Sequence, residues 1–235
     1  MSNSFFQFKQ FRIEQDKCAM KVGTDGVLLG AWTRPGNAER ILDIGTGTGL
    51  IAIMLAQRSS ALIDAIEIDE PAFLQAVENC SICPWPQRIK IMHVSFNEFA
   101  ESAVFRYDLI VSNPPFHKET VQSPSKSRGL ARHARYLEYG HILEEGSKLL
   151  TQSGRISLIL PAAEETNAIE KGTAHCLFVT RITRIIPVPG KPASRCLLEF
   201  SKEFNTCLAG SLVIEEKGRH QYSEEYAKLT GEYYL

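Results

Sequence analysis

The motif Asp43-Ile-Gly-Thr-Gly-Thr-Gly49 stands between an apolar run at residues 41–44 and a helical stretch at about residues 50–58. Glycine allows a tight turn and a close approach of the backbone to a ligand. Where neither is required, three alternating glycines would only destabilise the fold. In open α/β sheets, ligands bind beyond the carboxyl ends of the strands at turns of this kind. The motif therefore predicts a buried strand, a ligand-binding turn and a helix.

The remainder of the chain repeats this order of strand and helix. Apolar runs typical of strands lie at residues 61–68, 89–94, 108–112, 154–160, 177–186 and 196–201, and helical stretches at about residues 71–80, 137–150 and 163–175. Such alternation predicts βαβ units in a mostly parallel sheet. The last two runs are joined by the short turn Pro187-Val-Pro-Gly190, so they must be antiparallel. We expect an α/β fold: a mostly parallel seven-stranded sheet with an antiparallel C-terminal strand pair and helices on both faces.

The length of 235 residues, 44% of them hydrophobic, is sufficient for one large domain. We expect residues 40–235 to form the core and residues 1–39 to form a hairpin and a flap packed on it. Within this flap, the glycine-punctuated segment 21–30 contains Thr24 and leads into a short helix.

The composition favours a cytosolic protein without a membrane segment or a metal. The sequence has neither a signal-peptide-like start nor an apolar stretch of about 18 residues, the length that a membrane span requires. Its six cysteines follow no disulfide framework. Cys80 and Cys83 have the spacing of a zinc knuckle, but no second pair of ligands follows them. We expect buried, reduced thiols.

The formal net charge of −1 gives no general attraction to nucleic acid, so a polyanionic partner requires a local basic patch. Two basic segments are present. Residues 181–195 carry Arg181, Arg184, Lys191 and Arg195 without an acid, and residues 118–135 carry five cations against the single acid Glu119. Those five, which we interpret as RNA-binding residues, are Lys118, Lys126, Arg128, Arg132 and Arg135. The alternative for this segment is a solvated charged loop.

The glycine motif differs from a dinucleotide-binding fingerprint, because Leu50 occupies the place of its third glycine. It resembles instead the cofactor loop of Rossmann-like methyltransferases, which lies against the methionine part of S-adenosylmethionine. Glu67 ends the second strand of the core, where an acid can accept hydrogen bonds from both ribose hydroxyls. Asp69 is expected to cap the following helix. Ser95 stands where such enzymes place an acid for the adenine amino group, so it has either that role or a helix-cap role, and Phe96 can pack on the adenine.

The sequence Asn113-Pro114-Pro115-Phe116 follows the strand at residues 108–112 directly. The nitrogen of a planar amino group is a poor nucleophile because its lone pair is delocalised. The side-chain oxygen of Asn113 and the carbonyl of Pro114 can accept both of its N–H groups and so orient the lone pair, while the prolines stiffen the loop. Phe116 offers a stacking face for a planar group. The motif predicts methyl transfer to an amino or amide nitrogen, catalysed mainly by positioning.

Together, the glycine motif, Glu67 and the Asn113–Phe116 motif resemble the amino-group methyltransferases that act on adenine N6, guanine N2 or glutamine N5. Residues 21–32, the strand that precedes Asn113 and the chain length look like the bacterial tRNA(Val) adenine-N6 methyltransferases, which methylate the adenine immediately 3′ of the anticodon. This resemblance implies S-adenosylmethionine as cofactor and tRNA as substrate. It places the cofactor against Thr24, Asp43, Gly45, Thr46, Gly47, Gly49, Glu67, Ile68, Ser95, Phe96 and Asn113.

Three other functions are compatible with these motifs. Release-factor glutamine methyltransferases carry a helical domain ahead of the core, and only 40 residues precede Ile41 here. Guanine-N2 methyltransferases of rRNA usually carry a second, degenerate copy of the fold, for which the chain has no room. An RNA-binding protein with an inactive fold would have lost its motif residues, whereas Asp43, Glu67 and Asn113 are intact.

Overall fold

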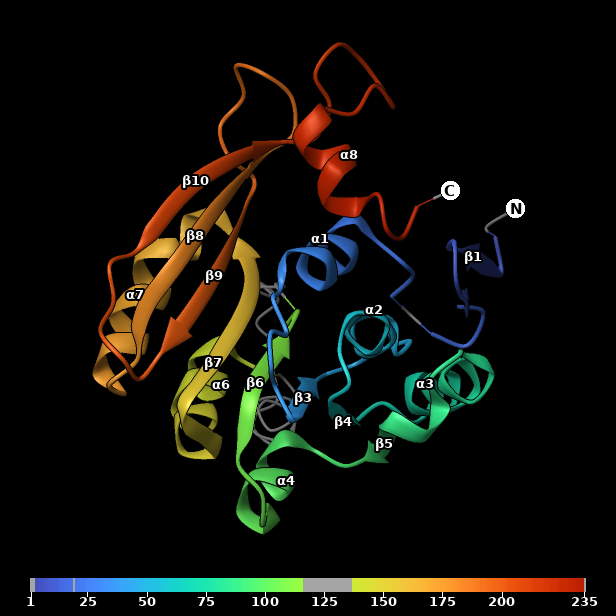
Figure 1. Cartoon of the computed structure of the whole chain (residues 1–235), viewed down its shortest axis with the longest axis vertical. Helices are drawn as coiled ribbons and strands as arrows, with labels where there is room; N and C mark the ends of the chain where they lie inside the picture. The colour runs from blue at the N-terminus through green and yellow to red at the C-terminus, as the bar shows by residue number, and fades with distance from the viewer. Residues whose placement is uncertain (1–2, 19, 116–136, 235) are drawn as a thin grey trace, which may run out of the picture.

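The computed structural model describes residues 3–18, 20–115 and 137–234. It contains an eight-stranded sheet with the strand order β10-β8-β9-β7-β6-β3-β4-β5 and a separate two-stranded hairpin, β1-β2 (Figure 1). The strands of the main sheet are β3 (Arg40–Ile44), β4 (Leu62–Glu67), β5 (Ile89–His93), β6 (Tyr107–Ser112), β7 (Leu150–Pro161), β8 (Phe178–Ile186), β9 (Arg195–Ser201) and β10 (Leu208–Val213).

Helices cover both faces of the sheet, as predicted (Figure 1). One face packs against α1 (Thr24–Trp32), α2 (Leu50–Arg58), α3 (Glu70–Ile82) and α8 (Glu224–Thr230). The other packs against α4 (Phe96–Ser102), α6 (Tyr139–Leu149) and α7 (Glu165–Ala174). Short 3-10 turns occupy Pro86–Arg88 and Ala162–Glu164. No helix in the described part of the chain is both long and apolar enough to cross a membrane.

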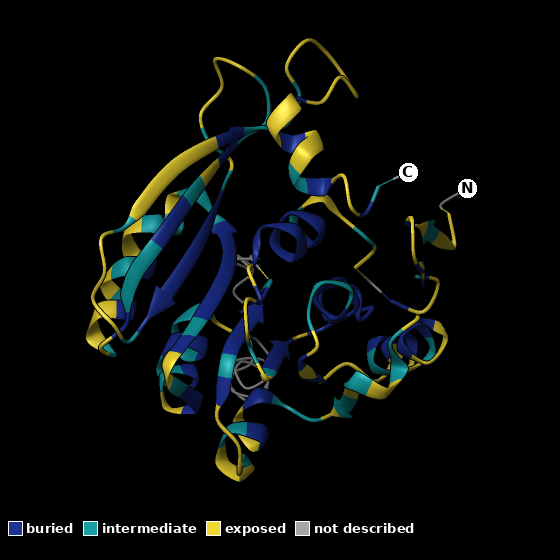
Figure 2. Ribbon diagram, viewed as in Figure 1, coloured by how far each residue is buried: buried dark blue, intermediate teal, exposed yellow. Residues whose placement is uncertain are grey.

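The predicted α/β fold is confirmed, with one strand more than the seven we expected. Strand β9 is antiparallel to both β7 and β8, and β10 adds a parallel strand beside β8. Only Leu212 of β10 is buried, and Figure 2 shows this strand exposed at the rim, beside strands that are largely buried. A strand with one buried side chain lacks the apolar run by which the other strands were recognised, which is why the sequence did not reveal it.

The N-terminal segment forms the expected hairpin and then helix α1. Strands β1 (Phe5–Gln7) and β2 (Arg12–Glu14) are antiparallel, with Phe6 opposite Ile13. The rings of Phe8 and Tyr234 stack with centroids 6.0 Å apart, and the N–H of Lys9 donates to the carbonyl of Tyr233 at 2.8 Å. The first and last described segments of the chain therefore pack together on the α2 side of the sheet.

Helix α1 is attached to the sheet through Trp32. The indole N–H of Trp32 donates to the Thr183 hydroxyl at 2.9 Å, and the guanidinium of Arg181 lies 3.5 Å from the ring centroid. At the same end of the helix, Arg58 donates to the carbonyls of Gly30, Ala31 and Thr33, which the helix itself leaves without partners. These contacts fix the helix whose first turn lies at the carboxyl edge of the sheet, where the Asp25 carboxylate pairs with Arg195 at the start of β9.

Candidate active site

The carboxyl ends of four adjacent strands, in the order β6, β3, β4 and β5, surround a cavity of about 430 Å³. The strands and the loops that follow them line it with Ile44, Gly45, Gly47, Ile66, Glu67, Ile68, Asp69, Val94, Ser95, Phe96, Asn97, Asn113 and Pro115, and Ala72 of α3 joins them. Leu137, Glu138 and His141 contribute from the start of α6, and Cys18 and Met20 from the N-terminal segment. The fold thus brings residues as far apart in the sequence as Cys18 and His141 into one site.

The glycine turn has the conformation that glycine permits. Gly45, Gly47 and Gly49 have φ values of 70°, 57° and 82°, which are left-handed and unfavourable for other residues. Gly45 and Gly47 line the cavity with backbone alone. A Cβ on Gly49 would lie 3.1 Å from the Cys80 sulfur, so this glycine permits close packing of α2 against α3. Gly49 therefore shapes the turn from behind instead of lining the cavity.

Asp43 and Thr46 also lie behind the turn. One carboxylate oxygen of Asp43 accepts the Thr46 hydroxyl at 2.6 Å and the Ala52 N–H at 3.2 Å, which joins β3, the turn and α2. Asp43 is fully buried and neither residue lines the cavity. In the structure both residues hold the turn, and their contact with a cofactor stays a prediction. Burial raises the pKa of the Asp43 carboxyl to about 7.

This pKa makes stability depend on pH. The ordinary value is 3.8, so between about pH 4 and pH 7 the folded chain retains a proton that the unfolded chain has lost. The contribution of this carboxyl to the free energy of unfolding is therefore fully present below pH 4. It decreases as the pH rises from 4 and is lost once the pH has passed 7. We expect the free energy of unfolding of the wild type, relative to Asp43→Asn, to fall over this range by on the order of 4 kcal/mol. Urea unfolding at a series of pH values measures the difference, and a constant difference would contradict the assignment.

Glu67 connects the glycine turn to the end of β4. Its Oε2 accepts the N–H of Gly47 at 2.9 Å, and its Oε1 accepts the N–H groups of Ile68 and Asp69 at 2.8 and 2.9 Å. The residue is 8% exposed and faces the cavity. Asp69 caps α3 as predicted, because its carboxylate accepts the Ala72 N–H at 3.2 Å. The carboxylate of Glu67 is thus held rigidly at the point where the sequence placed a ribose-binding acid.

Ser95 caps helix α4. Its hydroxyl accepts the Glu98 N–H at 3.3 Å and donates to the Glu98 carboxylate at 2.7 Å, a reciprocal capping box. Phe96, next in the chain, is 6% exposed and lines the cavity, with its ring edge-on to His141 at 5.6 Å. Of the two roles open for Ser95, the structure displays the helix cap.

The Asn113 motif begins at the end of β6. The buried Ser112 hydroxyl donates to the Ile44 carbonyl at 2.7 Å, which ties the end of β6 to the end of β3 beside the glycine turn. The Asn113 side-chain oxygen is buried and has no hydrogen-bond partner within the described structure. Asn113 and Pro115 line the cavity, while Pro114 is buried. A buried acceptor without a donor is unfavourable by about 1–3 kcal/mol, and Asn113 is a cavity-lining residue, so its oxygen is available to accept a ligand N–H.

Some predicted site residues lie elsewhere. Thr24 lines a different hollow, because α1 presents its first turn to α8 and not to the cavity. Phe116 and the predicted RNA-binding residues Lys118, Lys126, Arg128, Arg132 and Arg135 lie outside the described residues. In the second basic segment, three of the four cations form ion pairs within the protein: Arg181 with Glu199 at 3.3 Å, Arg184 with Glu165 at 2.6 Å and Arg195 with Asp25 at 2.8 Å.

Several residues that line the cavity were not predicted from the sequence, among them Cys18, Met20, Asn97, Leu137, Glu138 and His141. A signal existed for Asn97, because Ser95 and Glu98 have the spacing of a capping box and so predict a helix start there. The other five reach the cavity through tertiary packing, which leaves no local signal. Burial raises the pKa of the Cys18 thiol, so this side chain is not a ready nucleophile.

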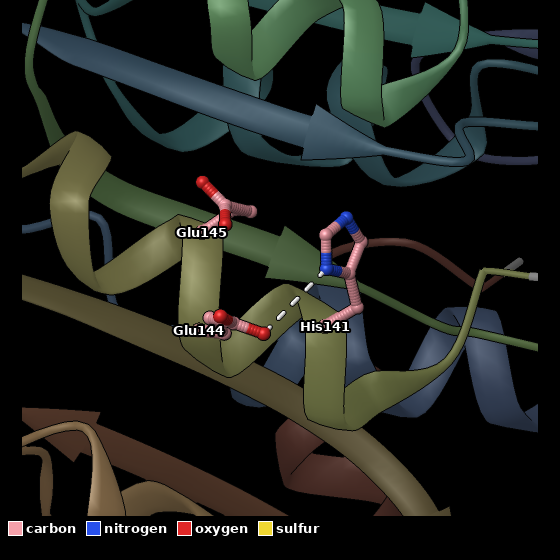
Figure 3. Close-up of side chains that lie close together, drawn as sticks. All are labelled: His141, Glu144 and Glu145. Carbon is pink, nitrogen blue, oxygen red and sulfur yellow. Dashed lines mark ion pairs between the residues drawn. The ribbon is translucent and has the colours of Figure 1, made fainter.

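On α6, His141 lies near two acids, and the three could together hold a metal ion (Figure 3). The His141 Nδ1 is 3.9 Å from the Glu144 carboxylate, and the other ring nitrogen is 2.5 Å from the Asn97 side-chain oxygen. Glu145 pairs with Lys148 at 2.7 Å. These polar groups have partners within the protein, and no other observation points to a metal here.

Residues 22–163 match the profile of the methyltransferase small domain family. The chain belongs to this family. It is 44% identical over 235 residues, all of this chain and 99% of the relative, to a tRNA1(Val) (adenine(37)-N6)-methyltransferase of Parabacteroides distasonis. A relative of the same name in Flavobacterium psychrophilum is 47% identical, over 98% of this methyltransferase and 99% of the relative. The resemblance inferred from the motifs is confirmed.

Solved structures of low sequence identity share the fold of the methyltransferase. A predicted O-methyltransferase from Agrobacterium tumefaciens aligns with a TM-score of 0.65 and 19% identity, covering 89% of this chain and 96% of its own. A putative S-adenosylmethionine-dependent methyltransferase from Streptococcus mutans aligns with a TM-score of 0.62 and 10% identity, covering 85% of this chain and 56% of its own. The Rossmann-like methyltransferase architecture is thereby confirmed.

Proposed function

We propose that the enzyme transfers a methyl group from S-adenosylmethionine to N6 of an adenine in tRNA, namely the adenine 3′ of the anticodon in tRNA(Val). The relatives that match the full chain carry this activity in their names. The observation that carries the proposal is the buried, unpartnered oxygen of Asn113 beside the glycine turn. It offers an acceptor to an amino group at the point where cofactor and substrate must meet.

The cavity fits the cofactor in shape and in donor set. It extends from the end of β6 over β3 and β4 to β5, so an elongated nucleoside can lie across the strand ends with its reactive end near Asn113. Gly45 and Gly47 present backbone to the amino acid portion, and the fixed carboxylate of Glu67 accepts the ribose hydroxyls. When bound, S-adenosylmethionine supplies an electrophilic methyl group on a sulfonium centre.

The adenine of the cofactor belongs beyond the ribose, at the end of β5. Ile68 is 44% exposed and faces the cavity, as does Phe96, so these two side chains offer apolar surfaces to the ring. The Ser95 hydroxyl donates its proton to Glu98 and serves the helix cap. The Asn97 side-chain oxygen, held by His141, is an alternative acceptor on the cavity wall, and we assign the adenine amino group to it.

Asn113 and Pro114 orient the substrate nitrogen. The Asn113 oxygen and the Pro114 carbonyl accept the two N–H groups, which directs the nitrogen lone pair out of the ring plane and toward the methyl group. Hydrogen bonding by Ser112 to Ile44 fixes this loop relative to the glycine turn. Positioning of this kind lowers the barrier without a strong base, because the methylated nitrogen is acidic while cationic.

The enzyme is expected to produce N6-methyladenosine in tRNA. Incubation with labelled S-adenosylmethionine and separate pools of tRNA, rRNA and peptide release factor, followed by nucleoside mass spectrometry, identifies the product. Label in N2-methylguanosine, or only on a release-factor glutamine, would show that the methyl acceptor is not adenine N6. Label in none of the pools would contradict the proposed function as a whole.

Asn113→Ala is expected to lower the single-turnover rate by about 100-fold, because it removes an acceptor that orients the reacting nitrogen. In this proposal the Asn113 oxygen binds the amino group of the substrate that receives the methyl group. The affinity for S-adenosylhomocysteine should therefore change little. Rapid-quench single-turnover assays and calorimetry separate the two effects. A rate equal to that of the wild type would show that Asn113 does not orient the substrate.

Two substitutions test the nucleoside end of the cavity. Glu67→Gln is expected to weaken binding of S-adenosylhomocysteine by about 1.5–3 kcal/mol, as for loss of a charged hydrogen bond.

Asn97→Ala should weaken binding of S-adenosylhomocysteine less than Glu67→Gln does. It should also abolish the preference for S-adenosylhomocysteine over its inosine analogue, which lacks the amino group. Calorimetry with both ligands measures these effects. If Asn97→Ala keeps the full preference, the adenine amino group has another partner.

A further inference from the structure

Two loops that follow β8 and β10 lie on the same edge of the sheet as the active site. Strands β7, β8 and β10 all run in the direction of β6, because β9 is antiparallel to both β7 and β8, and β10 is parallel to β8. The turn at residues 187–194 and the loop at residues 214–222 therefore leave the sheet at its carboxyl edge, beside α8 (Figure 1).

The second of these loops is a small hairpin, which we call the edge hairpin (residues 215–222). Glu215 and Tyr222 form an antiparallel bridge, and the N–H of Glu216 donates to the Gln221 carbonyl at 2.9 Å. His220 has a φ of 65°, a left-handed conformation that is uncommon for a residue with a side chain, and its N–H donates to the Glu215 carboxylate at 2.8 Å. Hydrogen bonds that sustain such a conformation indicate a defined loop shape.

Beside the edge hairpin lies a hollow of about 710 Å³, within the size range of small-ligand sites. Aromatic rings of Phe6, Tyr222 and Tyr234 line it, and Tyr222 is 47% exposed. The polar residues Gln7, Lys9, Thr24 and Thr230 also line it.

The hollow lies next to the active-site cavity. Val22 lines the hollow and Met20 lines the cavity, and the Cα atoms of these two residues lie within about 7 Å of each other. One short segment, residues 20–22, therefore contributes to the walls of both spaces.

The tip of the edge hairpin carries cations that are available to a ligand. Lys217 and Arg219 are exposed and, within the described part of the chain, form no ion pair and no side-chain hydrogen bond. The same holds for Lys191 in the neighbouring turn. These three differ from Arg181, Arg184 and Arg195, whose charges are paired inside the protein.

We propose that the hollow binds an unpaired nucleotide of the RNA substrate, with its base against Tyr222 and Tyr234 and the RNA phosphates at Lys217 and Arg219. This proposal rests on the proposed function. Aromatic rings stack on bases of any sequence, and cations of Lys and Arg neutralise phosphates. Sequence-specific RNA recognition usually engages unpaired loops whose bases are splayed apart. The nucleotide in the hollow then belongs to the same loop as the adenine in the active site and holds that loop at the cavity mouth.

The test measures binding of unmodified tRNA by fluorescence anisotropy at several salt concentrations, for the full chain with S-adenosylhomocysteine bound. Tyr222→Ala is expected to weaken binding about tenfold, and Tyr222→Phe to retain most of the affinity, because stacking needs the ring and not the hydroxyl. The double variant Lys217→Ala/Arg219→Ala should weaken binding and lower the salt slope by about 0.7–0.9 for each lost phosphate contact.

Arg106→Ala is the matched control, since Arg106 is also exposed but precedes β6 at the opposite edge of the sheet. Calorimetry with S-adenosylhomocysteine should give the same affinity for all variants, which also shows that they fold. If Tyr222→Ala and the double variant bind tRNA as tightly as Arg106→Ala does, the hollow is not an RNA site. If the wild type methylates no tRNA, the proposed function itself fails, so the two failures are distinguishable.

Discussion

The active site depends on the carboxylate of Glu67, which accepts three backbone N–H groups. Two of them belong to the end of β4 and one belongs to Gly47 in the turn after β3. A glycine turn has many accessible conformations, and hydrogen bonds to a fixed charged group select one of them. The cavity floor therefore exists before any ligand binds. The same carboxylate faces the cavity, so the side chain that shapes the floor is also the one that we propose binds the ribose.

Residues whose roles are local were predicted well from the sequence. The glycine turn, the acid at the end of β4, the cap at Asp69 and the strand before Asn113 depend on neighbours within a few positions, and each has a recognisable pattern. The antiparallel pair β8 and β9 followed from the shortness of the turn between them. The parallel order of the strands then brings Gly45, Glu67 and Asn113 to one edge, so the position of the site follows from these local patterns together.

Residues whose roles arise from tertiary contacts were not predicted. Cys18 and Met20 reach the cavity only because the N-terminal segment packs along α3 and the sheet edge, where Gln75 and Asn79 bind its backbone. Arg181 was part of a basic segment in the sequence, yet it lies 7% exposed between Glu199 and Trp32. A count of charges does not distinguish a cation that faces solvent from one that binds a buried acid. Asp43 and Thr46 belong to the glycine motif, and its pattern does not reveal that both are buried and support the turn from behind.

The contact between the two ends of the chain has a consequence for the order of folding. Phe8 stacks on Tyr234, and Lys9 donates to the Tyr233 carbonyl, so the hairpin that leads to Cys18 and Met20 packs against residues that follow the whole sheet in the sequence. Contacts so distant in sequence form late, because the chain must lose the conformational entropy of a long loop before these contacts can stabilise it. During translation, the sheet and the glycine turn can form while the wall of the cavity nearest the N-terminus is still unsupported. The wall of the cavity that Cys18 and Met20 form is therefore expected to become fixed after the strands and the glycine turn have folded.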